Sequence, residues 1–413
     1  MELIKRISGY TIISAITGGV SFLLLPVLTQ YLTPEDYGVL SIFNATIRFL
    51  SALIPLGIGN LLLVYLIEKK DAYPIYLKVF IKITFSTTLL LTIIIGILYF
   101  LNDDFFGLPF VLTICLPLAS LMVVYFETVN GYFVYLNKFK YYAKLTLSKF
   151  IIEIILVLLL VVLFPFNWQG RILSLVISLI LILIYVTIYF LRTGILNFNL
   201  KSSNKHSKSL IIKGFPLIFM GISIVIMNLS DRFFIEYYIG LKETGIYGIA
   251  STVAGILLMI IGALMNVIRP VIYEKIKTGL KGKKYLRLLT FKYIISLFII
   301  SLLLIFTSKF IFKWMINEAY NSALPIVYPL IFGLFFWGVY NYLVSFLMYK
   351  KLNNTIGVIS IFGILINLIL NYFFILKFKT IGAAYATLIT YFVICLLVII
   401  SSLFLRLNHT TSV

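Results

Sequence analysis

The chain has 413 residues, of which 62% are hydrophobic and only 12% are charged. A soluble core cannot bury so large an apolar share, so the composition excludes an ordinary soluble domain and predicts a polytopic membrane protein. The formal net charge of +20 is carried by short basic clusters between apolar runs. Basic residues between apolar runs are typical of membrane proteins, and their placement here argues against a nucleic-acid partner.

Apolar runs mark the expected membrane spans, because a helix needs about 20 apolar residues to cross the hydrocarbon core of a bilayer. Lys5 and Arg6 precede the first run and no small-residue cleavage site follows it, so we interpret it as an uncleaved span. Five prolines within the runs, among them Pro55, predict bent helices. In chain order the twelve expected spans are 7–28, 36–66, 76–101, 108–136, 144–164, 171–192, 211–238, 244–273, 288–308, 322–348, 354–376 and 380–405.

The Lys and Arg residues divide unevenly between the two sides of this topology. The two termini and every second connection, with the span ends beside them, hold 26 of the 34 residues, whereas the other connections hold 6. In membrane proteins the side rich in Lys and Arg faces the cytoplasm. We therefore expect a multi-pass protein of the inner (plasma) membrane with both termini in the cytoplasm.

The second half of the chain repeats features of the first half. The segments QYLTPEDYGVLSI and YYIGLKETGIYGIAS follow the first and seventh spans, and their residues Gly38 and Gly248 are 210 positions apart. The segments FNWQGRILSLVIS and FKTIGAAYATLIT precede the sixth and twelfth spans, and Gly170 and Gly382 are 212 positions apart. Because six is an even number of spans, both copies enter the membrane from the same side.

These patterns predict an all-α fold of about twelve transmembrane helices in two six-helix lobes, related as a parallel repeat. We expect an N-terminal lobe over residues 1–195, a cytoplasmic linker over 196–209 and a C-terminal lobe over 210–413. The linker is proposed because this stretch is polar, nearly central and rich in Ser, Asn and Lys. Two lobes of this kind usually enclose a central cavity.

Arg48 is a single charged residue within the apolar run SIFNATIRFLSALIPLG. It lies twelve residues after Asp36, which is about 18 Å at the helical rise and places it near mid-bilayer. An unpaired arginine there costs about 3 kcal/mol on insertion scales, so it should face water or a partner. It either forms a cationic wall with Asn44, one turn earlier, that binds an anion, or pairs with a carboxylate of its own lobe.

Glu127 and Glu153 are the carboxylates that could serve as this partner. Both are expected about 13–17 Å from the inner surface. A buried carboxylate without a partner tends to bind a proton, and a proton-coupled carrier needs such a group. The alternative is a fixed salt bridge to Arg48 or Lys149.

Asp231, Arg232 and Glu236 form a second charged group near the outer end of the seventh span. Arg232 and Glu236 are one helical turn apart and can pair, whereas Asp231 points elsewhere. One interpretation of the group is an interfacial helix end in contact with lipid headgroups and water.

Several chemistries have no motif in the sequence. There is no GxxxxGK[ST] phosphate loop, no HExxH, no paired-cysteine metal site and no GxSxG elbow. We therefore expect no catalytic residue, metal centre or cofactor. A transporter of this kind would draw its energy from an H⁺ or Na⁺ gradient, from the substrate gradient or from a partner.

Four segments resemble a known family: YLTPEDYG, its second-half partner IGLKETGIYG, the DRFFIEYYIG ending of the seventh span and the KTIGAAYAT opening of the twelfth. They are similar to the polysaccharide-transport branch of the MOP superfamily, the multidrug, oligosaccharidyl-lipid and polysaccharide exporters. Within that branch the resemblance is to the O-antigen and capsule repeat-unit flippases of the Wzx type. It implies a V-shaped, MATE-like, two-lobed transporter. Its implied substrate is an undecaprenyl (polyprenyl)-diphosphate-linked oligosaccharide, moved to the outer leaflet by alternating access.

The charged residues have candidate roles from their positions and, for the group of Asp231, Arg232 and Glu236, from the resemblance. Substrate binding is expected at Arg48, Asn44 and Arg232, where Arg48 would receive the diphosphate or an acidic sugar. Coupling or gating is expected at Glu127, Glu153, Asp231 and Glu236, the last two in the substrate path or outer gate. The implied partners are a polysaccharide polymerase and a chain-length regulator.

Two other functions remain open from the sequence. A MATE-like drug or cation antiporter would favour an acidic or aromatic cavity over one with Arg48 at mid-depth. A polytopic polysaccharide polymerase or ligase is expected to carry a large outer loop with basic catalytic residues, and none of the expected outer loops is long enough. A lipid II flippase is a close variant of the first interpretation, but that family typically has additional spans.

Overall fold

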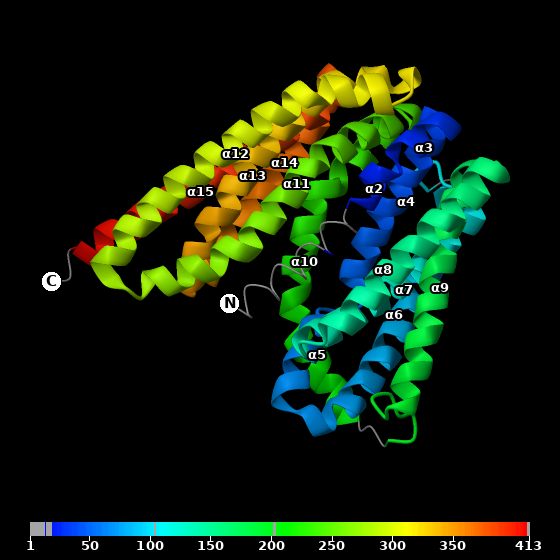
Figure 1. Cartoon of the computed structure of the whole chain (residues 1–413). Helices are drawn as coiled ribbons and strands as arrows, with labels where there is room; N and C mark the ends of the chain where they lie inside the picture. Colours follow the sequence, from blue (N-terminus) through cyan, green and yellow to red (C-terminus); the bar gives the residue numbers. More distant parts are fainter. Residues whose placement is uncertain (1–12, 14–18, 103–104, 201–203, 411–413) are drawn as a thin grey trace. The chain divides into compact units, whose positions relative to one another are not determined.

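The computed structural model describes residues 13, 19–102, 105–200 and 204–410 (Figure 1). These residues form helices and connecting turns without a strand, which confirms the expected all-α class. In chain order the elements are α2 (Val20–Leu23), α3 (Leu25–Tyr31), α4 (Pro34–Leu53), α5 (Ile58–Glu68), η1 (Lys70–Ala72), α6 (Tyr73–Asn102), α7 (Phe110–Tyr135), α8 (Phe139–Val157), η2 (Leu158–Leu163), α9 (Asn167–Arg192), α10 (Asn204–Tyr238), α11 (Leu241–Ile276), α12 (Gly279–Met315), η3 (Glu318–Ala323), α13 (Leu324–Tyr349), α14 (Asn353–Phe378) and α15 (Thr380–Thr410).

Nine helices in the described part of the chain are long and apolar enough to cross a membrane, or ten if α4 and α5 count as one bent span. Two of the twelve expected spans are absent even from the count of ten. Half of the span expected at 7–28 lies outside the described residues, and the one at 211–238 corresponds to α10, in which several side chains are not described. Large apolar side chains are exposed along the helices, for example Ile93, Phe298 and Phe306. Such surfaces are stable against lipid and not against water.

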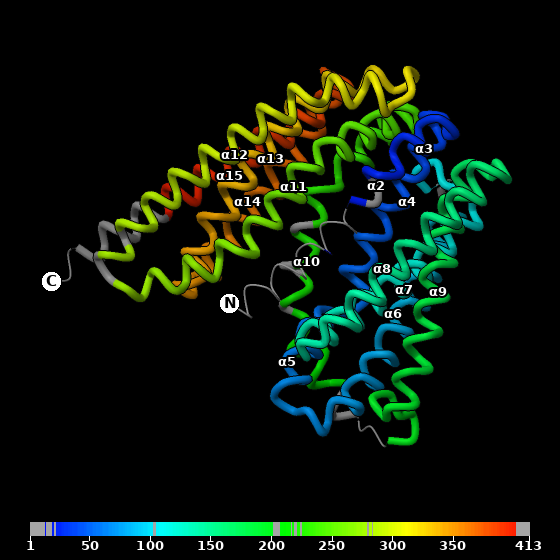
Figure 2. The backbone as a smooth tube through the Cα atoms, in the orientation of Figure 1, coloured from blue at the N-terminus to red at the C-terminus, as the bar shows by residue number. Residues whose placement is uncertain are grey.

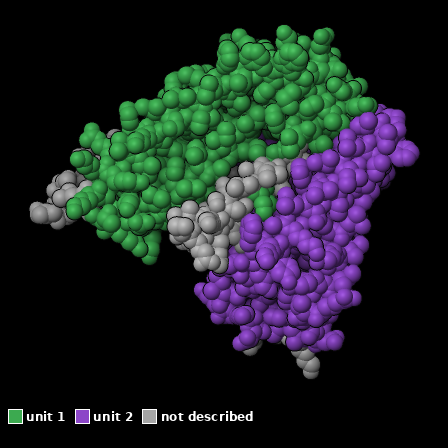
Figure 3. All heavy atoms as spheres, in the orientation of Figure 1, with its two compact units in different colours: residues 1–37, 230–413 green, residues 38–229 purple. Residues whose placement is uncertain are grey.

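The chain divides into two compact units, residues 38–229 and residues 1–37 with 230–413 (Figure 3). These units differ from the expected lobes of 1–195 and 210–413. The short helices before α4 pack within the second of these units, where the Tyr320 hydroxyl donates to the Leu32 carbonyl over 2.9 Å. The first half of α10 belongs to residues 38–229 instead. From Asn204 onward the stretch expected as a linker is helical and belongs to α10.

The TPED segment explains where α4 begins. The Asp36 carboxylate accepts from the Thr33 backbone N–H at 3.0 Å, and the Thr33 hydroxyl accepts from the Asp36 N–H at 3.2 Å. This reciprocal capping satisfies two backbone donors that a helix start otherwise leaves unpaired. Pro34 follows the cap at the first helical position, where a missing N–H costs nothing.

The span that begins with α4 is broken near Pro55, as the sequence predicts for a proline within an apolar run. Helices α4 and α5 meet at 51°, and the backbone can be followed through the bend in Figure 2. Gly57 at the bend has φ +70°, a left-handed conformation that favours glycine. A Cβ at Gly57 would lie 2.1 Å from the Gly214 carbonyl oxygen of α10. The bend and the first half of α10 therefore meet backbone to backbone.

The repeat predicted from glycine spacing is matched by similar local packing in each half. Gly170 lies in the first turn of α9, where an added Cβ would be 2.7 Å from the carbonyl oxygen of Leu160 in η2. Gly382 lies in the first turn of α15, where a Cβ would be 2.1 Å from the carbonyl oxygen of Phe374 in α14. Each glycine lets a helix start close against the end of the preceding element.

Candidate functional site

Arg48 of α4 forms an ion pair with Glu127 of α7. The guanidinium Nη1 donates to Glu127 Oε1 over 2.9 Å, and both side chains remain more than half exposed, at 63% and 56%. Asn44, one turn before Arg48 on α4, is exposed as well. The contact is the carboxylate pair that the sequence left open for Arg48, and it lies on an exposed face of residues 38–229 that Asn44 shares.

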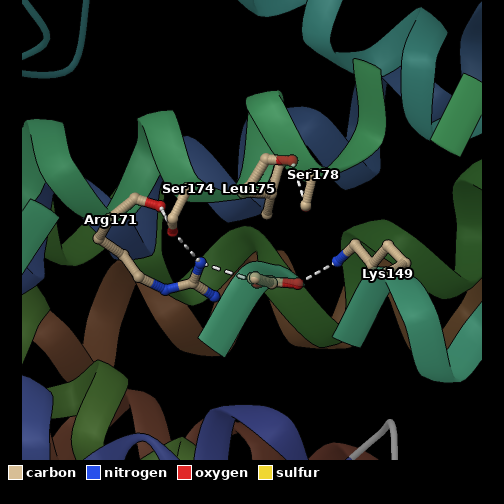
Figure 4. A network of polar contacts seen from close by, with 6 residues as sticks. Lys149, Arg171, Ser174, Leu175 and Ser178 are labelled. Atoms are coloured by element: carbon tan, nitrogen blue, oxygen red, sulfur yellow. Dashed lines mark hydrogen bonds and ion pairs between the residues drawn. The ribbon is translucent and has the colours of Figure 1, made fainter. Parts of the chain in front are cut away.

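A second charged group is buried between α8 and α9, within the same unit (Figure 4). The Glu153 carboxylate, 3% exposed, accepts from Arg171 Nη1 over 2.8 Å and from the ammonium of Lys149, one helical turn earlier. Arg171 also donates to the Ser174 hydroxyl over 3.3 Å. Two cations stabilise the ionised form of a buried carboxylate. Glu153 is therefore held as a fixed anion, which matches the salt-bridge alternative for this residue.

Sequence reasoning missed Arg171, which the expected topology assigns to an outer connection. The structure places it in the first turns of α9, opposite Glu153 of α8. Its pairing depends on the register between two antiparallel helices, and sequence spacing carries no information on that register. One weak sign of a buried polar face was present in the sequence: Ser174 lies three positions after Arg171 and therefore on the same face of the helix.

The two charged groups of residues 38–229 together contain three cations and two carboxylates. One positive charge is left in excess. The exposed part of this assembly is the Arg48 pair, and it is suited chemically to binding an anion, because guanidinium offers two parallel donors to carboxylate or phosphate.

Asp231 of α10 lies in the other unit and is buried, with 2% of its surface exposed. Its Oδ2 accepts hydrogen bonds from the Tyr247 hydroxyl of α11 and from the Thr387 hydroxyl of α15, the latter over 3.3 Å. Its Oδ1 has no hydrogen-bond partner among the described residues. For Asp231 the interfacial interpretation is therefore wrong, because three helices enclose the carboxylate and keep it from headgroups and water.

The residue before Asp231 joins a neighbouring polar network. The Ser230 hydroxyl donates to Asn367 Oδ1 of α14 over 2.9 Å, and Asn371 Nδ2 donates to the same oxygen over 3.1 Å. Asn371 Oδ1 is a second buried oxygen without a hydrogen-bond partner in the described structure. Two buried acceptors are thus left unsatisfied within one set of helices, which is costly unless a proton or cation occupies the site at some stage.

The other two residues predicted for this group are less deeply buried. The Arg232 guanidinium lies 5.7 Å from the centroid of the Tyr247 ring, in reach of a cation–π interaction. Glu236, one turn further along α10, is half-buried. Among the described residues no cluster of three or more His, Cys, Asp or Glu side chains suits a resident metal ion.

The sequence matches the family model described as polysaccharide biosynthesis protein over residues 3–275. This match covers more than half of the chain. The chain belongs to the polysaccharide biosynthesis protein family. A search of curated protein sequences gave no match.

Solved structures similar to this member of the family share its fold at low sequence identity. An inward-facing multidrug resistance MATE transporter of the MOP superfamily is 11% identical, with a TM-score of 0.71 and 96% of each chain covered. The lipid II flippase MurJ in an inward closed conformation is 19% identical, with a TM-score of 0.70, covering 97% of this chain and 87% of that one. A MOP superfamily transporter from Pyrococcus furiosus is 14% identical, with a TM-score of 0.58 and coverage of 99% and 97%.

The family match places the chain among polysaccharide biosynthesis proteins, and the solved structures show that it shares the fold of the MATE transporter and of MurJ. The family member is a multi-pass membrane protein with a MOP transporter fold.

Proposed function

We propose that the protein flips polyprenyl-diphosphate-linked oligosaccharide repeat units across the inner membrane during assembly of O-antigen, capsule or exopolysaccharide. Alternating access exposes the substrate site first to the cytoplasm, where both termini lie, and then to the outer side. A polysaccharide polymerase and a chain-length regulator are the partners expected to receive the product. In this role the protein acts as a transporter and not as an enzyme.

The observation that carries this proposal is the exposed guanidinium of Arg48 on a long apolar helix of a polysaccharide biosynthesis protein. The diphosphate is the shared anionic group of lipid-linked oligosaccharides, whatever their sugars. Arg48 binds it through charge-assisted, bidentate hydrogen bonds, and Asn44 adds a polar contact one turn away. Arg232 is the corresponding candidate in the other unit.

Replacing Arg48 tests this assignment. Arg48→Ala should reduce surface polysaccharide at least about tenfold, because a charge-assisted pair to a phosphate is worth about 1.5–3 kcal/mol. Arg48→Lys should retain part of the activity, since it keeps the charge and loses the two parallel donors. Surface polysaccharide is measured in cells whose membranes contain equal amounts of each variant. Wild-type polysaccharide with both variants would remove Arg48 from the substrate site.

Ion coupling is proposed at Asp231, with H⁺ or Na⁺ as the transported ion. The support is a buried carboxylate whose Oδ1 lacks a partner, next to a network in which Asn371 Oδ1 lacks one as well. Both oxygens are ligand types that Na⁺ accepts, and the carboxylate alone can carry a proton. Glu127, Glu153 and Glu236 are weaker candidates, Glu153 because two cations already neutralise it.

The coupling proposal predicts a specific change in Asp231→Asn. This variant keeps the size of the side chain but loses the charge, so flipping should no longer respond to an imposed Na⁺ or H⁺ gradient. Initial flipping rates in vesicles are compared with and without each gradient. A response equal to that of the parent protein would exclude Asp231 as the coupling group.

A MATE-like antiporter is the second candidate, because a multidrug resistance MATE transporter shares the fold over 96% of the chain. The excess positive charge around Arg48 disfavours a cationic drug. Export of cationic dyes that depends on this protein, without any effect on polysaccharide, would favour the antiporter.

A further inference from the structure

The exposed pair of Arg48 and Glu127 contrasts with the buried Glu153 group in how firmly its carboxylate is held. Glu153 accepts from two cations and is 3% exposed. Glu127 makes one ion-pair contact with Arg48 and is 56% exposed. An exposed ion pair of this kind stabilises a protein only slightly, because water and salt screen it. The Arg48 pair is therefore exchangeable, whereas the Glu153 group is fixed.

The guanidinium of Arg48 keeps unused donors while it is paired. Only Nη1 hydrogen-bonds to Glu127, and Nε and Nη2 make no hydrogen bond to the described residues. A phosphate that approaches Arg48 thus meets free N–H groups first. It can then take the place of Glu127, because diphosphate carries more charge and more acceptor oxygens than one carboxylate.

From this contrast we propose that Glu127 is a built-in competitor for the substrate at Arg48, which the diphosphate displaces on binding and which returns when the substrate leaves. The inference rests on the proposed function, since it assigns Glu127 a role at the same site. Glu127 lowers the affinity of the site for phosphate groups and so promotes release. It also keeps free inorganic anions from occupying Arg48 in the empty carrier.

The proposal predicts a gain of affinity on removal of a charged residue. In purified full-length Glu127→Gln, undecaprenyl diphosphate should bind about two- to fivefold more tightly than in the parent, the factor that corresponds to an exposed ion pair. Inorganic pyrophosphate should compete for the site at correspondingly lower concentrations. In vesicles, both the apparent KM and the maximal flipping rate should fall, because release becomes slower. A merely structural pair would instead give weaker binding when it is broken.

Two further variants isolate the effect. In an Arg48→Ala background, Glu127→Gln should change the affinity no further, because the group for which it competes is gone. Glu274→Gln is the matched control, since Glu274 forms an exposed ion pair with Lys275 over 3.2 Å in the other unit. The Glu274→Gln protein should bind undecaprenyl diphosphate with the affinity of the parent protein.

The outcomes separate this inference from the proposed function. Unchanged or weaker binding by a folded Glu127→Gln protein, together with weaker binding by Arg48→Ala, would overturn the competitor role alone. Unchanged binding by Arg48→Ala would overturn the substrate site at Arg48 itself.

Discussion

Replacing Glu153 with alanine is expected to destabilise the protein by about 3–5 kcal/mol, the typical cost of removing one partner from a buried ion pair. The carboxylate is 3% exposed and pairs with Arg171 and Lys149, which are themselves only 12% and 19% exposed. Its loss leaves two cations in the interior without a counter-charge. The thermal midpoint of the purified protein in detergent should fall on the order of 10 °C, and less protein should be recovered from membranes.

Two variants separate charge burial from simple loss of a contact. Glu127→Gln breaks an ion pair of similar length that is 56% exposed at the carboxylate, so the thermal midpoint should change little. Replacing Lys149, Glu153 and Arg171 together by Met, Leu and Met should recover most of the stability, because apolar side chains of similar size can substitute for a buried ion group. A Glu153→Ala protein as stable as the parent would show that the group is not buried as described.

Replacing Gly57 with alanine is expected to cost about 2–5 kcal/mol. The left-handed backbone contributes about 1–2 kcal/mol for any residue with a Cβ, and overpacking contributes about 1–3 kcal/mol. The added methyl would lie 2.1 Å from the Gly214 carbonyl oxygen and 3.0 Å from Leu217 Cβ. The bend between α4 and α5 would then have to move away from α10. Thermal unfolding of the purified variant measures the loss.

Gly59 provides a control two positions away. It lies in α5, and an added Cβ meets nothing within 4 Å. Gly59→Ala should leave the thermal midpoint unchanged or raise it, because alanine stabilises a helix relative to glycine. Equal midpoints for Gly57→Ala and Gly59→Ala would contradict the backbone contact between the bend and α10.

Features that depend on local spacing could be predicted from the sequence. The apolar runs predict the helices because length and hydropathy decide whether a segment spans a bilayer. Pro55 predicts the break between α4 and α5. The nearly equal spacing of two glycine pairs predicts the repeat. The structure gives the reason for one pair, because Gly170 and Gly382 both lie too close to a backbone carbonyl for a side chain. Arg48 stands out because a charge at mid-span requires water or a partner.

Features that depend on the packing of distant helices could not be predicted in the same way. The sequence offers Glu127 and Glu153 equally as partners of Arg48, and only the placement of α7 and α8 separates the exposed pair from the buried one. The burial of Asp231 depends on α11 and α15, which supply Tyr247 and Thr387. The division of the chain into units depends on which helices the ends of α10 contact, and sequence patterns leave that open.

The most direct test of the account is the flipping of a lipid-linked oligosaccharide by the purified protein in vesicles. Undecaprenyl-diphosphate oligosaccharide with a fluorescent sugar is placed in both leaflets, and an impermeant quencher measures its transfer to the outer leaflet. Transfer should be much faster with the protein than in protein-free vesicles, and Arg48→Ala should slow it at least about tenfold. Transfer no faster than in protein-free vesicles, or equally fast with Arg48→Ala, would contradict recognition of the diphosphate by Arg48.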